Sequence, residues 1–86
     1  MVTNIAFATF SGSRDQIVIN IIKENDTYRA FINGEIFPLV AALYAVDRVG
    51  YVVKMEEFID LARFHKVELV QYRSQDTPNE KPFLLA

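Results

Sequence analysis

The stretch "FINGEIFPLVAALY", residues 31–44, decides the fold of this chain. Asn33-Gly34 predicts a two-residue β-hairpin turn, because a type I′ turn needs positive φ at both central residues. Residues 35–37 would return as a short strand. Pro38 ends the pairing, since it has no N–H to donate, and it suits the first position of a helix. The glutamate of this stretch has no partner acid, base or ligand nearby in the sequence, so we interpret the stretch as architecture and not as a ligand loop.

Three strands are predicted before this turn, over residues 2–10, 16–23 and 27–32. They are rich in β-branched and aromatic residues, and residues 11–15 between the first two have the composition of a loop. In the second strand Ile17, Ile19 and Ile21 share one face. The other face holds Gln16, Val18, Asn20 and Ile22. Its two apolar residues indicate that it is half covered, by another subunit or by the helices.

Two helices are predicted after the turn, over residues 38–48 and 54–65. The first carries Leu39, Ala42, Leu43 and Val46 on one face. In the second, acidic residues come early and basic residues come late, which complements the helix dipole. Residues 51–53 between the helices fit either an extended link or a helix lead-in. Residues 67–73, "VELVQYR", alternate like a last strand.

The predicted fold is an α+β two-layer sandwich. The elements follow the order β-β-β-(short β)-α-α-β, with an antiparallel sheet and two helices on one of its faces. We expect a single domain over residues 1–73. Residues 74–86 would form a polar tail that ends in the apolar segment PFLLA.

Composition excludes several classes of protein. The chain has 86 residues, no cysteine, 51% hydrophobic residues and a formal net charge of −2. It therefore has neither disulfides nor thiolate zinc sites to stabilise it. The weak negative charge argues against a general polyanion binder. The longest apolar run, residues 36–46, is shorter than the roughly 20 residues of a membrane span, and we expect a cytoplasmic protein without a signal peptide or membrane segment.

No motif in the sequence points to catalysis, to a metal or to a cofactor. His65 is the only histidine, and the residues three and four positions before it are apolar, so no ligand pair forms on that helical face. The three serines lie outside any nucleophile-elbow pattern. Ser11, Ser13 and Arg14 around Gly12 could contact an anion, but a phosphate loop would open a helix, whereas a strand follows here. We expect a non-enzymatic protein.

A nucleic-acid-binding accessory protein is the alternative interpretation. Its candidate residues are Tyr28, Arg29, Lys54 and Arg63. An arginine among aromatic residues on a strand could stack single-stranded bases. The basic residues are dispersed, however, and the helix pair lacks the small and apolar residues that a helix-turn-helix motif requires around its turn glycine.

The favoured prediction is a small protein-interaction or regulatory accessory module that forms a homodimer. The first helix has no charge before Asp47, and a helix that is apolar around most of its girth packs either in a large core or against another chain. The tail also ends in apolar residues. The predicted interface residues are Leu39, Leu43, Tyr44, Phe83 and Leu84.

Overall fold

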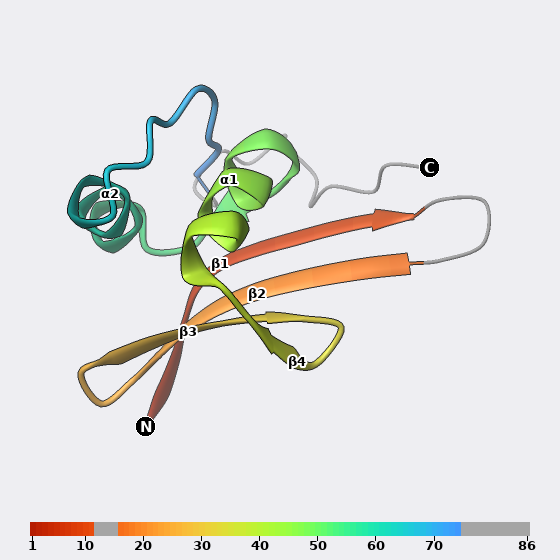
Figure 1. Cartoon of the computed structure of the whole chain (residues 1–86), viewed down its shortest axis with the longest axis horizontal. Helices are drawn as coiled ribbons and strands as arrows, with labels where there is room; N and C mark the ends of the chain where they lie inside the picture. The colour runs from red at the N-terminus through yellow and green to blue at the C-terminus, as the bar shows by residue number, and fades with distance from the viewer. Residues whose placement is uncertain (12–15, 75–86) are drawn as a thin grey trace.

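The computed structural model describes residues 1–11 and 16–74, and Figure 1 shows a five-stranded sheet with two helices packed on it. The elements are β1 (Val2–Ser11), β2 (Gln16–Glu24), β3 (Thr27–Ile32), β4 (Glu35–Phe37), α1 (Leu39–Val49), β5 (Tyr51–Val52) and α2 (Met55–Phe64). All the strand pairs are antiparallel, in the order β4-β3-β2-β1-β5. The predicted α+β two-layer fold is confirmed.

The turn between β3 and β4 is the one that the sequence predicts. Asn33 and Gly34 have φ angles of 52° and 84°. The Asn33 N–H donates to the Val18 carbonyl, and the Val18 N–H donates to Oδ1 of Asn33, both at 2.9 Å. The side chain of Asn33 thus continues the pairing of β2 with β3, which is a structural role.

The helix-facing side of the sheet holds the core. Cross-strand register places Val52, Ala6, Ile21 and Ala30 in one row, and each is at most 1% exposed. Small side chains in this row let α1 approach the sheet closely. The other fully buried core residues on the strands and helices include Ile5, Ala8, Ile19, Ala42, Leu43, Val46 and Phe58.

Both helices lie within about one residue of their predicted bounds. Pro38 precedes α1, which ends at Val49. In α2 the first turn holds Glu56 and Glu57 and the last turn holds Arg63, which is the charge order that the helix dipole favours.

The prediction of a last strand at residues 67–73 is wrong, and the fifth strand is β5 between the two helices. The reason lies in the partners of its amides. Val70 and Gln71 donate their N–H groups to the buried carboxylate of Asp47 in α1, at 2.7 and 2.9 Å. The segment touches the sheet at one parallel bridge, between Val52 and Ser74. The Asp47 side chain therefore accepts the hydrogen bonds that the backbone of a neighbouring strand would otherwise accept.

Two predicted segments fall largely outside the described residues. They are the loop at residues 11–15, apart from its first residue, and the tail at residues 74–86, apart from Ser74.

Replacing Asp47 by alanine is expected to release the segment at residues 67–74. Asp47 is 2% exposed, and its loss leaves two N–H groups without their acceptor, at a cost of about 2–4 kcal/mol in the free energy of unfolding. Hydrogen exchange of the Val70 and Gln71 amides, with urea unfolding, measures both effects. The control is Asp60→Ala, an exposed ion-pair residue, which should change stability by about 0.5 kcal/mol. Equal exchange in the two variants would contradict this role of Asp47.

Gly50→Ala is expected to destabilise the fold because of close approach at the end of α1. A Cβ built on Gly50 lies 2.5 Å from the Phe7 carbonyl oxygen and 2.6 Å from the Ala8 Cβ. Relief requires a backbone shift, which costs about 1–3 kcal/mol. Gly34→Asn is the matched control, since nothing lies within 4 Å of that Cβ position and asparagine tolerates positive φ. Urea unfolding of both variants checks the difference, and equal losses would contradict it.

Candidate functional site

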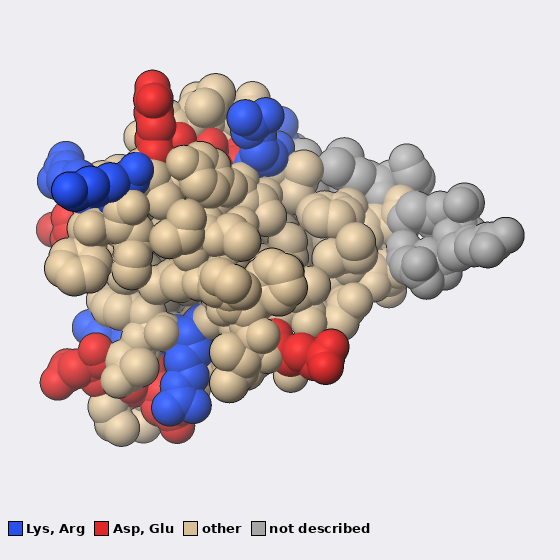
Figure 2. All heavy atoms as spheres, in the orientation of Figure 1, with Lys and Arg blue, Asp and Glu red and all other residues tan. Residues whose placement is uncertain are grey.

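The outer side of α1 carries an apolar surface, which we call the α1 surface and define as Phe37, Val40 and Tyr44. These side chains are 43%, 38% and 44% exposed. Val40 and Tyr44 are four residues apart in α1 and lie on one side of it, and Phe37 is the last residue of β4, two positions before the helix begins. Figure 2 shows that the charged side chains lie toward the margins of this view and leave its central part uncharged. This surface therefore presents exposed apolar side chains to solvent.

The predicted interface residues are placed differently from one another. Tyr44 is exposed. Leu39 is partly buried and lines a cleft. Leu43 is 0% exposed and belongs to the core of the chain itself, so its neighbours Val40 and Tyr44 form the accessible surface. Phe83 and Leu84 lie outside the described residues.

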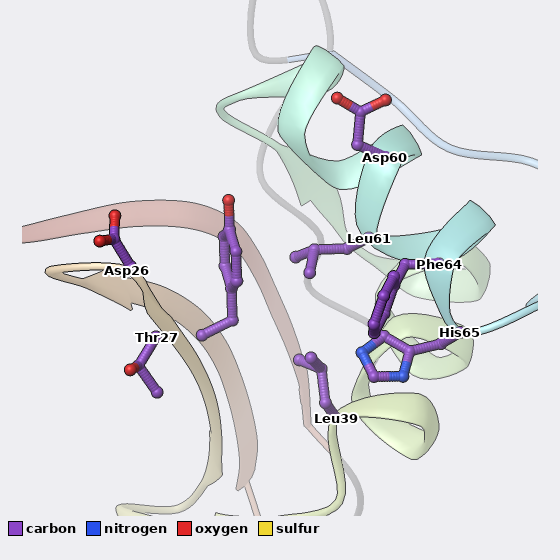
Figure 3. A pocket seen from close by; sticks show the side chains of 8 residues that line it. Asp26, Thr27, Leu39, Asp60, Leu61, Phe64 and His65 are labelled. Atoms are coloured by element: carbon purple, nitrogen blue, oxygen red, sulfur yellow. The ribbon is translucent and has the colours of Figure 1, made fainter.

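A cleft of about 700 Å³ opens between the start of β3, the start of α1 and the end of α2 (Figure 3). Its lining consists of Asp26, Thr27, Tyr28, Leu39, Asp60, Leu61, Phe64 and His65. Leu39 and Leu61 point toward its centre, and the rings of Phe64 and His65 lie side by side. The two ring centroids are 5.1 Å apart in an edge-on arrangement. The cleft is mainly apolar, and its size suits a small group or a side chain of another protein.

The cleft does not assemble a recognisable catalytic constellation. Thr27 offers a hydroxyl and His65 an imidazole, but no hydrogen bond between a nucleophile and a base is observed among the lining residues. In the described part of the chain no three histidine, aspartate or glutamate side chains gather as metal ligands would. Across residues 1–11 and 16–74, neither helix has the length and apolarity needed to cross a bilayer.

Beside the cleft, a polar contact joins the sheet to α2. The Tyr28 hydroxyl donates to Oε2 of Glu57 at 3.0 Å, and Nζ of Lys23 lies 3.5 Å from the same oxygen. Burial raises the pKa of Tyr28 above 10.0, and the hydrogen bond to Glu57 and its charge act in the same direction. The charge of Glu57 also raises the pKa of Lys23. The three groups thus favour the neutral phenol and the charged amine.

The residues predicted for nucleic-acid binding do not form one surface. Tyr28 and Arg29 are consecutive in β3, so their side chains lie on opposite faces of the sheet. Tyr28 faces α2, whereas Arg29 lies 3.9 Å from Glu24. Lys54 is exposed just before α2, and Arg63 lies 3.8 Å from Asp60 in its last turn.

The sheet face away from the helices, which we call the open face, forms a second apolar surface. Register places Tyr51, Phe7, Asn20, Phe31 and Ile36 in one row across all five strands. Ile36 is 71% exposed and the other four are half-buried. From the two apolar residues Val18 and Ile22, sequence reasoning inferred that this face is half covered by another subunit or by the helices. It did not assemble the row, because the row needs the register of all five strands.

Phe64 was also missed as a surface residue. It is 79% exposed, and an aromatic residue off the apolar stripe of the second helix was the available signal. Comparison with models of protein families, with curated proteins and with solved structures finds no match to this chain.

Tyr28→Phe is expected to remove a pH-dependent part of the stability. The folded pKa of Tyr28 is raised, so its contribution is fully present below the unfolded pKa of about 10 and is lost as pH rises through the folded pKa. The stability difference between the natural chain and the variant should therefore be constant up to about pH 9 and shrink above about pH 10. Urea unfolding at several pH values measures it.

Glu57→Gln provides the control for this experiment. It removes the charge that raises the pKa of both Tyr28 and Lys23, so the loss of stability above about pH 10 should be smaller than in the natural chain and should be complete at a lower pH. Parallel pH profiles for the natural chain and Tyr28→Phe would contradict the contact.

Proposed function

We propose that this chain is a small non-catalytic protein-interaction module that self-associates. The α1 surface carries the proposal, since Phe37, Val40 and Tyr44 are each more than a third exposed. Exposed apolar side chains that lie together on one side of a fold are typical of contact sites for other proteins. Tyrosine and phenylalanine are also enriched in such interfaces.

A second surface supports the same proposal from the other side of the molecule. The open face presents Phe7, Phe31 and Tyr51 across the sheet. In the described part of the chain, Phe37, Val40 and Tyr44 are exposed and the aromatic residues of the open face are half-buried, so both surfaces are available for contact. With two apolar surfaces on opposite sides, the chain can contact two other chains at once.

The nucleic-acid alternative draws support from the aromatic residues of the open face, which could stack bases. Weighing against it, Lys23, Arg29 and Arg63 each lie within 4 Å of a carboxylate. Binding of a single-stranded oligonucleotide that weakens steeply between low and moderate salt would favour this alternative.

The molar mass in solution tests self-association. Light scattering over a wide range of protein concentration should show the mass of the full chain rising from 9.9 kDa toward twice that value. A mass that stays at 9.9 kDa at every concentration would contradict the proposal.

A chain ending at Ser74 is the informative comparison, because it keeps the backbone contact between Val52 and Arg73. We expect it to associate as the full chain does. Loss of association in a folded truncated chain would instead assign the interface to the segment that holds Phe83 and Leu84.

A further inference from the structure

The open face has an unusual residue at its centre. The strand order β4-β3-β2-β1-β5 makes β2 the middle strand. Asn20 lies on β2, opposite Phe7 of β1 on one side and Phe31 of β3 on the other. A carboxamide therefore occupies the middle of a row that is otherwise aromatic or aliphatic.

The side-chain oxygen of Asn20 lacks a hydrogen-bond donor among the described residues. This atom, Oδ1, is buried. Buried polar atoms in folded proteins nearly always have a partner. The torsion about the Cβ–Cγ bond is soft for asparagine, so this oxygen can turn outward, where a donor from outside the sheet can reach it.

The charges on the open face permit a second copy to approach. Register places one cation and one anion of the strands on this face, Arg29 and Glu24. They lie 3.9 Å apart, so they largely offset each other. An uncharged face does not repel its own copy, whereas it offers little to a phosphate backbone.

The size of the open face also suits a dimer. Five strands span about 19 Å, and the pairing of β1 with β2 extends over about 30 Å. Because β3, β4 and β5 have only six, three and two residues, the face measures roughly 500 Å² in projection, near the roughly 600 Å² that each partner buries in the smaller specific interfaces.

We propose that two copies of this chain pack open face to open face, with the two Asn20 carboxamides meeting at the twofold axis. A residue on such an axis contacts its own copy. Asparagine is self-complementary there, because the amide N–H of each copy donates to the Oδ1 of the other. Phe7 and Phe31 flank this pair on both sides, and a buried polar pair of this kind fixes the register of an apolar interface.

This inference rests on the proposed self-association and specifies its surface. The α1 surface lies on the helix side of the sheet, so it would remain free in the dimer for a different chain.

Charge substitutions on the full chain test the assignment. Phe31→Arg introduces a charge into the row, and Asn20→Asp places two carboxylates at the axis. Each should raise the dimer dissociation constant roughly 100-fold, because like charges are brought together. The discriminating variant is Tyr44→Arg, which puts the same charge on the α1 surface: the constant stays unchanged if the open face is the interface and rises if the α1 surface is. Circular dichroism and thermal unfolding show which variants are folded.

A covalent probe gives an answer that does not depend on affinity. The natural chain has no cysteine, so Asn20→Cys creates a single thiol at the axis. Under mild oxidation it should form a disulfide-linked dimer, because residues at the axis can bring their Cβ atoms to about 4 Å. Tyr44→Cys should stay reduced under the same conditions.

Each outcome has one meaning. A dimer weakened by Phe31→Arg or Asn20→Asp but not by Tyr44→Arg, with the disulfide formed at position 20, supports the inference. A dimer weakened by Tyr44→Arg alone overturns the inference and leaves self-association standing. A dimer that resists all three charges, without the disulfide, also overturns it. A natural chain that is monomeric at every concentration contradicts the proposed function and the inference together.

Discussion

One short helix has to cover most of a five-stranded sheet, and the rest of the molecule follows from this constraint. α1 has 11 residues and is therefore about 16 Å long, while the sheet is about 19 Å across. The helix can approach the sheet because alanines lie beneath it and Gly50 follows it. The inner side of α1 is buried in the core, and its outer side is exposed to solvent. Since α2 lies on the same face of the sheet, neither of these two helices packs on the other face.

Much of the fold could be predicted because local chemistry determines it. Asn33-Gly34 specifies its turn by backbone conformation, and Pro38 marks the start of α1. The segment at residues 67–73 could not be assigned correctly from its alternation. Alternation reports which side chains are buried, but it does not report which groups accept the backbone N–H donors. Here the acceptor is Asp47, about 23 residues earlier in the chain, and no sequence period reveals such a pairing.

Only part of the candidate surfaces could be predicted from the sequence. The apolar girth of α1 indicated an interface, but the predicted interface combined Leu43, which is buried, with Tyr44, which is exposed. The difference depends on how the helix is rotated against the sheet. Asn20 looked like an ordinary polar residue on a half-covered strand face. Its central position became visible only when the strands were placed in register.

The two edges of the sheet, in contrast to its faces, are poorly suited to binding another chain. At one edge β4 has three residues and is followed at once by Pro38. At the other edge β5 has two residues, and Ser74 pairs alongside Val52. Short strands, a proline and an edge that is already occupied all hinder the addition of a foreign strand. Association of this fold should therefore use its faces and not the open-ended cross-β pairing that grows from long unprotected edges.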